Sequence, residues 1–530
     1  MHPGLNLFTY SFQGNMSTAS RLISGSAASW AQIAVTMISQ MVLVPIYLSH
    51  WSVVTYGTWL AVQALVSIIT TLDYGHQEFL GYEFLRIGRN NRTELSAYMW
   101  SGASVGLLIS VLQTGLILGF LSTEAFPKLL GQSNAMSPSL LHDAGLVLVF
   151  QVVTWLLSIS ITGLLFRALA PFGYYPRMMW WNLCGAILTA LASVVAVVWG
   201  AGLLITGLVA AAVSVAFSVP IYIDLFRLLR REQIPFCVPS AKLGAKNFLR
   251  SLVLSTKWML ENARQQGARL VLAPLAGAAN LAAFSTMRTG ANVAIQGLNT
   301  VVNPLMPELM RFIHQRDQTR VESAFGTVWF VLVAVLAPTI VVVQAFVEPA
   351  YLLWTRGRVP FNPLLFATLS LSALVYAVAQ PAIAVVKGNN LLRPQLLLST
   401  IAALAVVGGI YLLVPTIGIL GGGVALLTAE ITAALGYQFF ASRWLHRNGL
   451  QWPKQHYLIA TASVAIAAIT VGMLVILPQA KWLIICVALP LLFGNLWRYW
   501  QALPTLTIQH AIRIANSLPG VSRVYALSKF

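Results

Sequence analysis

The chain contains few charged residues. Only 9% of its 530 residues are Asp, Glu, Lys or Arg, whereas 58% are apolar, and the mean hydropathy is +0.77. So few charges cannot solvate the surface of a water-soluble globule of this size. Runs of about 20 apolar residues, the length that crosses a bilayer as a helix, recur from Trp30 to Leu496. The composition therefore predicts an all-α polytopic membrane protein without a soluble domain.

Cysteine and the usual catalytic motifs are also scarce. Cys184, Cys237 and Cys486 have no CxxC spacing and lie in or near apolar segments, which indicates small buried side chains rather than disulfides or a metal site. The chain has no Walker motif, no Gly-rich phosphate loop and no nucleophile–base pair. The first 20 residues do not have the pattern of a cleaved signal peptide. We therefore expect no enzyme activity, no cofactor and no metal.

Fourteen membrane-spanning helices are predicted from the apolar runs. Their approximate bounds are residues 22–49, 56–84, 96–121, 142–166, 178–199, 202–226, 252–274, 280–304, 324–347, 363–386, 395–414, 418–441, 457–477 and 482–500. Of the 32 Lys and Arg, 24 fall in alternate loops on one side, four lie within spans, and four lie on the other side: Lys128, Arg356, Arg358 and Lys481. The positive-inside rule then places both termini in the cytoplasm of a bacterium, with the chain in its inner membrane. The net charge of +18 thus indicates topology rather than nucleic-acid binding.

The two halves of the chain share a weak internal repeat. The matching segments are 92–98 with 320–325, 165–177 with 385–394, and 200–212 with 418–429. Helix order and loop spacing agree, as in transporters built from duplicated bundles. We predict an N-terminal six-helix bundle at 1–230, a cytoplasmic linker at 231–251, a C-terminal six-helix bundle at 252–445, two additional transmembrane helices at 446–500 and a cytoplasmic amphipathic tail at 501–530.

Three short motifs carry a family resemblance. They are Tyr56-Gly57-Thr58-Trp59 followed by Leu72-Asp73-Tyr74-Gly75, the loop Lys387–Pro394, and the glycine cluster Pro415–Gly423. With them the chain resembles the polysaccharide-transport branch of the multidrug/oligosaccharidyl-lipid/polysaccharide exporter (MOP) superfamily. The resemblance implies two pseudo-symmetric, MATE-like bundles around a central cavity, and Wzx-type members flip lipid-linked oligosaccharide repeat units. Such members usually have twelve spans. Fourteen spans are typical of the lipid II flippases, whose arginine-containing signature is reduced here to Arg21.

Charged residues within the spans are the candidate site, because such residues are costly in lipid and usually face a bundle interior or water. At 100° per residue, Lys257, Glu261 and Arg264 share one face of the seventh span, and Arg269 lies a turn deeper and off that face. The eighth span has a polar face of Arg288, Asn292, Gln296, Asn299 and Asn303. The first two spans have less pronounced polar faces. Polar faces on these four spans together predict a water-filled cavity between the halves. Hydrogen bonding between helices is the alternative for the uncharged groups.

The predicted cavity is mainly cationic, which suits an anionic substrate. Diphosphate oxygens accept bidentate hydrogen bonds from guanidinium groups, and amides bond sugar hydroxyls. We therefore expect substrate to bind at Lys257, Arg264, Arg269, Arg288, Asn292, Gln296 and Asn299. Glu261 either pairs with Lys257 or Arg264 or titrates with protons coupled to transport. Asp73 and Glu83 are further candidates for ion coupling.

The cavity and the resemblance together predict a flippase. Such a protein would move polyprenyl-diphosphate-linked oligosaccharide across the inner membrane for O-antigen, capsule or exopolysaccharide synthesis, by alternating access. Its expected partners are the lipid-linked glycan, membrane lipids, and a polysaccharide polymerase with its assembly proteins. The alternatives are a lipid II-type flippase, a cation-coupled multidrug antiporter, a glycan polymerase or ligase, and a structural membrane protein. The antiporter predicts a deep carboxylate on the first span and the enzyme predicts a large outer loop, and the sequence has neither.

Overall fold

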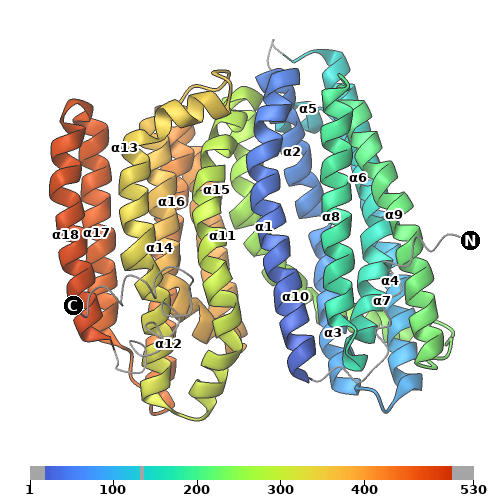
Figure 1. Ribbon diagram of the computed structural model, residues 1–530. Coiled ribbons are helices and arrows are strands. Elements are labelled where there is room, and N and C mark those ends of the chain that lie inside the picture. Colours follow the sequence, from blue (N-terminus) through green and yellow to red (C-terminus); the bar gives the residue numbers. More distant parts are fainter. Residues whose placement is uncertain (1–17, 132–135, 504–530) are drawn as a thin grey trace, which may run out of the picture.

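The protein is a bundle of long helices that run roughly along one direction (Figure 1). The structure, a computed structural model, describes residues 18–131 and 136–503. Every regular element in these ranges is helical, which confirms the predicted all-α fold. The elements are α1 (Thr18–His50), α2 (Val53–Ile69), α3 (Thr71–Ile87), α4 (Arg92–Leu121), α5 (Ala125–Leu129), α6 (Pro138–Trp155), η1 (Leu156–Ser160), α7 (Ile161–Leu169), η2 (Ala170–Phe172), α8 (Tyr175–Val198), α9 (Leu203–Arg231), α10 (Ala241–Ala276), α11 (Ala278–His314), α12 (Gln318–Val331), η3 (Leu332–Leu336), α13 (Ala337–Trp354), α14 (Pro363–Gly388), α15 (Leu392–Ile417), α16 (Leu420–Arg447), α17 (Lys454–Ile476), η4 (Pro478–Ala480) and α18 (Lys481–Ala502).

The number of membrane spans depends on the two most polar long helices. Eleven helical segments of the described chain are long and apolar enough to cross a membrane, and α2 with α3, bent by 41°, makes twelve. With 36 and 37 residues, α10 and α11 are also long enough to span a bilayer, but charged and amide side chains lower their hydropathy. Including them gives the predicted fourteen, which is therefore an approximate count.

Helix packing in the first half is repeated in the second. The helix α1 packs on α8 as α10 packs on α15, and α8 packs on α9 as α15 packs on α16. Likewise α6 packs on α9 as α14 packs on α16, and α2 packs on α6 as α11 packs on α14. These matched neighbours are what a duplicated bundle produces. The last two helices, α17 and α18, pack on each other and lie at the outer edge of the second half (Figure 1).

The two halves share their apolar core at only one end of the molecule. There, Leu48 and Val62 of the first half belong to the same buried cluster as Phe284 and Leu365 of the second half. Toward the other end the core divides into a cluster on α3, α4, α7, α9 and the connection after α9, and a second cluster that lies wholly within residues 298–503 of the second half and the last two helices. The ribbons of α1 and α11 diverge toward this end (Figure 1). We call it the basic end, because the α3–α4 and α11–α12 turns lie there with Arg89 and Arg316.

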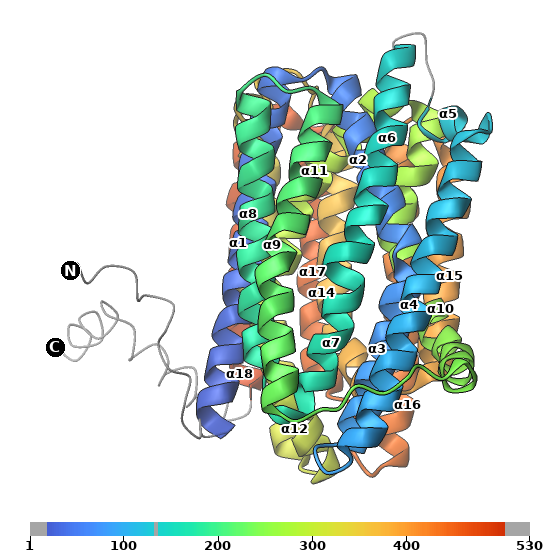
Figure 2. The ribbon, with the colours of Figure 1, turned by 90° about the vertical axis from the view of Figure 1, so that its right-hand side faces the viewer.

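The connection between the halves runs along the first half. In Figure 2 the segment between α9 and α10 crosses the basic end before α10 begins. The hydroxyl of Ser96 on α4 donates to the Pro235 carbonyl, and the Ser240 amide donates to Ser101 Oγ at 2.9 Å. Because α10 begins at Ala241, the second part of the predicted linker 231–251 is helix. The predicted amphipathic tail at 501–530 lies almost wholly outside the described residues and stays a prediction.

The cysteines are less buried than predicted. Cys184 on α8 and Cys486 on α18 are exposed, and Cys237 in the α9–α10 connection is half-buried. The helices α8 and α18 also expose large apolar side chains such as Leu191 and Leu491. The two exposed thiols therefore lie on apolar outer surfaces, where lipid rather than protein covers them.

Candidate functional site

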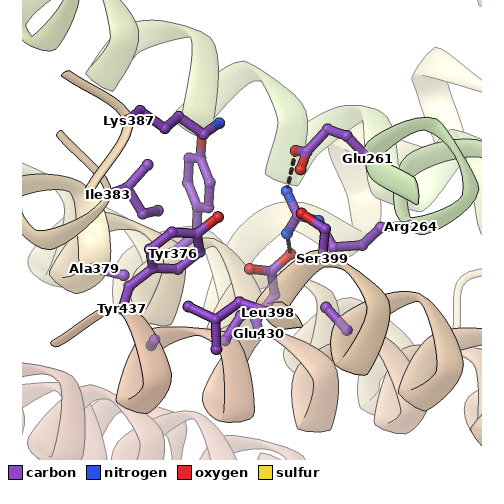
Figure 3. Close-up of a pocket in the computed structure, with 13 residues that line it drawn as sticks. Glu261, Arg264, Tyr376, Ala379, Ile383, Lys387, Leu398, Ser399, Glu430 and Tyr437 are labelled. Carbon is purple, nitrogen blue, oxygen red and sulfur yellow. Dashed lines mark hydrogen bonds and ion pairs between the residues drawn. The ribbon is translucent and has the colours of Figure 1, made fainter. Parts of the chain in front are cut away.

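A pocket opens within the second half, between α10, α14, α15 and α16 (Figure 3). It encloses about 380 Å³ including its open mouth. Its polar lining comprises two acids, two cations and three hydroxyl groups: Glu261, Glu430, Arg264, Lys387, Tyr376, Tyr437 and Ser399. Lys387 ends α14 at the basic end, whereas Glu430 lies near the middle of α16. The formal charges of the two acids and the two cations cancel.

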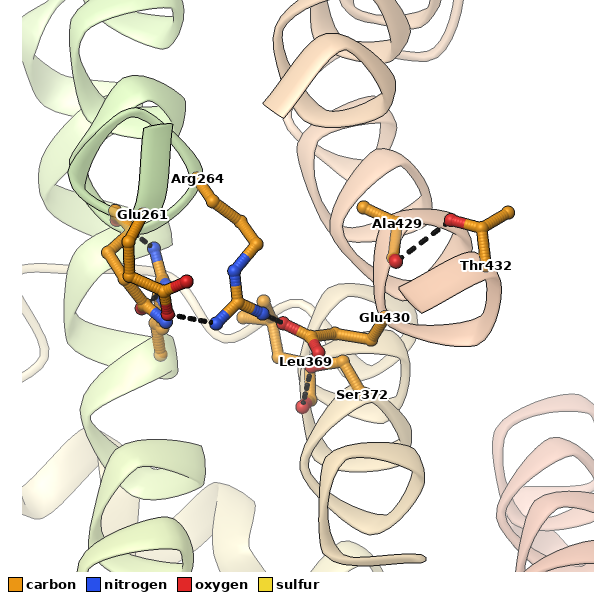
Figure 4. A network of polar contacts seen from close by, with 9 residues as sticks. Glu261, Arg264, Leu369, Ser372, Ala429, Glu430 and Thr432 are labelled. Carbon is orange, nitrogen blue, oxygen red and sulfur yellow. Dashed lines mark hydrogen bonds and ion pairs between the residues drawn. The ribbon is translucent and has the colours of Figure 1, made fainter. Parts of the chain in front are cut away.

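Arg264 bridges two carboxylates in this pocket (Figure 4). Its side chain is only 8% exposed, and its Nη2 donates to Glu261 Oε1 at 2.6 Å. Its Nη1 donates to Glu430 Oε1, on a helix 166 residues further along the chain. A buried charge is stable when it is paired and hydrogen-bonded, and both conditions hold here. Arg264 is therefore neutralised within the second half, and its predicted role in binding substrate stays a prediction.

Arg269 and Arg288 have no carboxylate partner among the described residues. Arg288 is 7% exposed, and it donates to the Gln265 carbonyl at 2.8 Å and to Gln265 Oε1 at 2.9 Å. Arg269 donates from Nη1 to Gln266 Oε1 at 3.1 Å, and its Nε has no partner. Arg269 lies within electrostatic range of Arg288 and of Tyr56 on α2. Two cations without a bonded carboxylate thus lie within electrostatic range of each other where α10 and α11 meet the first half, and Glu430 also acts electrostatically on Arg288.

The amide side chains of α11 extend the polar surface away from Arg288. Asn292, Gln296 and Asn299 are half-buried, and none of them has a side-chain hydrogen bond to another described residue. Hydrogen bonding between helices, the alternative raised by the sequence, is therefore not used by these three amides. Their donors and acceptors are free for water or a ligand.

The other predicted site residues are dispersed. Lys257 is half-buried on α10, and its Nζ lies 6.0 Å from the ring centroid of Trp258. Glu83 accepts from Arg86 Nη2 at 2.6 Å near the basic end of α3, so it forms a local ion pair. Asp73 is fully buried and is the third residue of α3, just after the bend from α2. Ion coupling by any acidic residue stays a prediction.

Asp73 belongs to a polar network inside the first half. Its Oδ2 accepts from Gln77 Nε2 and from Trp155 Nε1, each at 2.8 Å. Gln77 Oε1 in turn accepts from Arg167 Nη1 at 2.8 Å, and Arg167 Nη2 lies 3.5 Å from Glu78 Oε2. The network therefore runs from the interior of the first half toward Arg167, near the basic end of α7.

Several of these groups were not predicted from the sequence. Glu430 is an acid within a predicted span, so the rule that selected Glu261 could also have selected it. Gln265, Trp155 and Arg167 gave no comparable signal, because their roles depend on which helices pack together. No group of three or more potential metal ligands occurs in the described parts of the chain.

Comparisons with known proteins identify the fold. No family model matches the chain, and no curated protein matches it. Solved structures do match. An inward-facing multidrug resistance MATE transporter of the MOP superfamily has a TM-score of 0.57 and 15% identity, over 80% of this chain and 95% of that one. A mutant of the Vibrio cholerae MATE transporter VcmN has a TM-score of 0.55 and 13% identity, over 81% and 97%.

A third similar structure is a MOP superfamily transporter from Pyrococcus furiosus, described as having a binding pocket of reverse polarity. Its TM-score is 0.52, with 16% identity over 81% of this chain and 96% of that one. Such neighbours have twelve helices in two halves. This chain therefore has the fold of these transporters, with α17 and α18 packed beside the second half.

Proposed function

We propose that the protein is a flippase that moves polyprenyl-diphosphate-linked oligosaccharide units across the inner membrane by alternating access. The diphosphate and sugar cross between the two halves, and the polyprenyl chain stays in the lipid. Loading occurs at the basic end, which the positive-inside rule assigns to the cytoplasm. The glycan then serves the synthesis of O-antigen, capsule or exopolysaccharide.

The arginine pair Arg269 and Arg288 carries this proposal. The two side chains repel each other electrostatically and are not bonded to a carboxylate among the described residues, so an incoming anion would relieve their mutual repulsion. Together with Lys257, Arg264, Lys387, Glu261 and Glu430, the two arginines form a group of five cations and two acids with a net formal charge of +3. Lys257 also lies within electrostatic range of Glu78, which pairs with Arg167. The α11 amides Asn292, Gln296 and Asn299 suit the hydroxyls of a sugar.

The division of the apolar core supports alternating access. The halves share a core at one end and have separate cores at the basic end, so a rocking motion can close one end while it opens the other. The TM-score is 0.57 against the inward-facing MATE transporter and 0.52 against the outward-facing one.

A multidrug antiporter is the second candidate, because the similar solved structures are MATE transporters. Export of cationic drugs requires an accessible carboxylate. Within the described residues α1 carries no acid, Glu261 and Glu430 are bonded to Arg264, and Asp73 is buried inside the first half. Glu430 also acts electrostatically on Arg288, but neither Arg269 nor Arg288 is bonded to a carboxylate among the described residues, which supports an anionic cargo.

Reconstitution tests the proposal directly. Full-length protein in liposomes should transfer a polyprenyl-diphosphate sugar to the opposite leaflet, where an impermeant sugar-oxidising reagent detects it. Arg269→Gln and Arg288→Gln should each slow transfer by about tenfold or more, because a hydrogen bond to a charged group is worth about 1.5–3 kcal/mol. Arg320→Gln, an exposed arginine paired with Asp317, is the matched control and should transfer normally.

Normal transfer by both arginine variants would contradict the cationic site. Transport of a cationic dye without transfer of the lipid-linked sugar would instead establish the antiporter. Both variants must be present in the membrane at the control's level, because loss of folded protein would also slow transfer.

A further inference from the structure

We propose that Gln265 and Gln266 are positioning residues for Arg288 and Arg269, and that their uncharged acceptor oxygens make the site selective for anions. Each glutamine holds a guanidinium group in place without cancelling its charge. This role rests on the proposed function, because the glutamines act on the diphosphate only through the two arginines. Both glutamines lie on α10, and neither was among the predicted site residues.

Gln265 holds one edge of the Arg288 guanidinium group. Arg288 Nη1 donates to the Gln265 carbonyl at 2.8 Å, and Arg288 Nη2 donates to Gln265 Oε1 at 2.9 Å. Because both acceptors belong to one residue, the two bonds fix the plane of the guanidinium group and join α11 to α10. A guanidinium group has five N–H donors, so one on Nε and one on each Nη remain for the oxygens of an anion.

Gln266 holds Arg269 from the next position of α10. Gln266 Oε1 accepts from Arg269 Nη1 at 3.1 Å. Arg269 Nε is shielded from solvent and bonds to none of the described residues. Most buried N–H groups in proteins have a hydrogen-bond partner, so this donor lacks an acceptor. A bound anion would supply it.

The two glutamines act on different sides of α10. Consecutive residues of a helix point about 100° apart. Gln265 therefore reaches across to α11, whereas Gln266 bonds to the next turn of its own helix. The two guanidinium groups are held from two directions and still lie within electrostatic range of each other. A diphosphate has one phosphate group for each of them.

Arg264, the residue before Gln265, shows what charged acceptors do at this depth. Its guanidinium group is bonded to the carboxylates of Glu261 and Glu430, which neutralise it. Glu430 acts on Arg288 electrostatically but does not bond to it. Glutamine and glutamate have nearly the same shape. An amide in place of a carboxylate therefore keeps the geometry of a bonded arginine and leaves its positive charge for the cargo.

The alternative role for Gln265 is to join α10 to α11 by hydrogen bonds. The two roles give opposite expectations for Gln265→Glu. A carboxylate bonds to Arg288 more strongly than an amide does, so a purely structural bond would be strengthened and anion binding would not change. A site that needs the charge of Arg288 would also become more stable, because a buried cation gains a partner, but would lose affinity for anions.

Binding of inorganic pyrophosphate to the full-length protein in detergent, measured by calorimetry, tests this role. Gln265→Glu should weaken binding by about tenfold or more, because it neutralises one of the two cations that bond the anion. It should also raise the melting temperature measured without pyrophosphate. Gln265→Met, which removes the side-chain acceptor and keeps the charge of Arg288, should lower both the affinity and the melting temperature.

Gln479→Glu is the matched control. It adds the same charge in the exposed turn before α18 and should bind pyrophosphate like wild type. Equal affinity of wild type and Gln265→Glu would overturn the proposal. If Gln265→Glu does not fold, Gln266→Glu, which should neutralise Arg269 in the same way, is compared with wild type, and equal affinity there overturns the proposal as well.

Sugar transfer in liposomes separates this role from the proposed function. Equal transfer of the polyprenyl-diphosphate sugar by wild type and Gln265→Glu would refute the role of Gln265 alone. Pyrophosphate binding that Gln265→Glu weakens, without sugar transfer by wild type, would refute the proposed cargo and leave an anion site positioned by glutamine. If wild type neither binds pyrophosphate nor transfers the sugar, the proposed function and the role of the glutamines are both refuted.

Discussion

Arg264 on α10 and Glu430 on α16 form a buried ion pair that joins the first helix of the second half to the last of its six core helices. Glu261 completes the arrangement from one turn earlier on α10. The pair fixes the position of α10 relative to the second half, because both charges are buried and bond to each other across the two helices. The same bonds withhold Arg264 from any cargo until a carboxylate is displaced.

Removing Arg264 should therefore destabilise the protein. Arg264→Ala leaves Glu261 and Glu430 buried without their cation, and breaking a buried pair in this way costs about 3–5 kcal/mol. Unfolding in detergent by heat or denaturant measures the loss. Arg311→Ala removes an exposed pair with Glu308 and should change stability little. Equal stability of the two variants would show that Arg264 is not held as described.

Replacing Gly57 by alanine, which adds only one methyl group, should destabilise the contact between the two halves. It lies on α2 where the halves share their core, and an added Cβ would overlap the backbone of Ala278 at the start of α11. Gly57→Ala should destabilise this conformation by about 1–3 kcal/mol and shift the halves apart at that end. Spin labels on α1 and α11 near the basic end should then show a shorter distance. Gly119→Ala on α4, which has open space, should change neither quantity.

The α17–α18 hairpin should depend on one amide. Asn495 is buried, and its Nδ2 donates to the Ile459 carbonyl at 2.8 Å and to Ser463 Oγ at 2.7 Å. Asn495→Ala should weaken the hairpin by about 1–2 kcal/mol, the range found for hydrogen bonds between membrane helices. Protease sensitivity of the 477–481 turn would report the loosening. Gly494→Ala, with open space beside it, is the control and should leave the turn protected.

The hydrogen bond between Tyr174, just before α8, and Glu232 should be lost at high pH. Tyr174 donates to Glu232 Oε1 at 2.6 Å, and burial, together with this acceptor, raises the pKa of Tyr174 from 10.0 to about 12. A raised pKa means that the contribution to stability is complete below pH 10 and is lost as the pH rises through about 12. The stability difference between wild type and Tyr174→Phe should follow this course. A difference independent of pH would contradict the bond.

Much of the fold could be predicted from the sequence. Hydrophobic runs and the alternation of Lys and Arg are local patterns, so they place helices and turns without knowledge of packing. The repeat between halves appeared as matched loops and reappears in the structure as matched helix contacts. The bend at Thr70 and the π-turn that ends at Ser160 were not predicted, because each is a small backbone change that leaves the hydrophobic pattern intact.

The site was predicted less completely than the fold. The polar faces of α10 and α11 were visible as a helical period, yet the period alone does not show which charges are neutralised. Arg264 and Arg269 look alike in sequence, but only Arg264 meets carboxylates, one of them from a helix 166 residues away. Asp73 was identified by its charge, whereas Trp155, the last residue of α6, is placed against it only by the packing of the helices.

The contacts of α10 indicate along which helix interface the two halves can move relative to each other. This helix packs against α3 of the first half as closely as against α15 of the second. Toward α16 it is held by Arg264, whereas toward α3 it presents Ser251 and Ser255 against His76 and Gly75. Small side chains permit translation without large gaps, but an ion pair does not. The interface between α3 and α10 is thus where the two halves can slide past each other. A bulky residue at Gly75 would block this movement sterically without altering any charge.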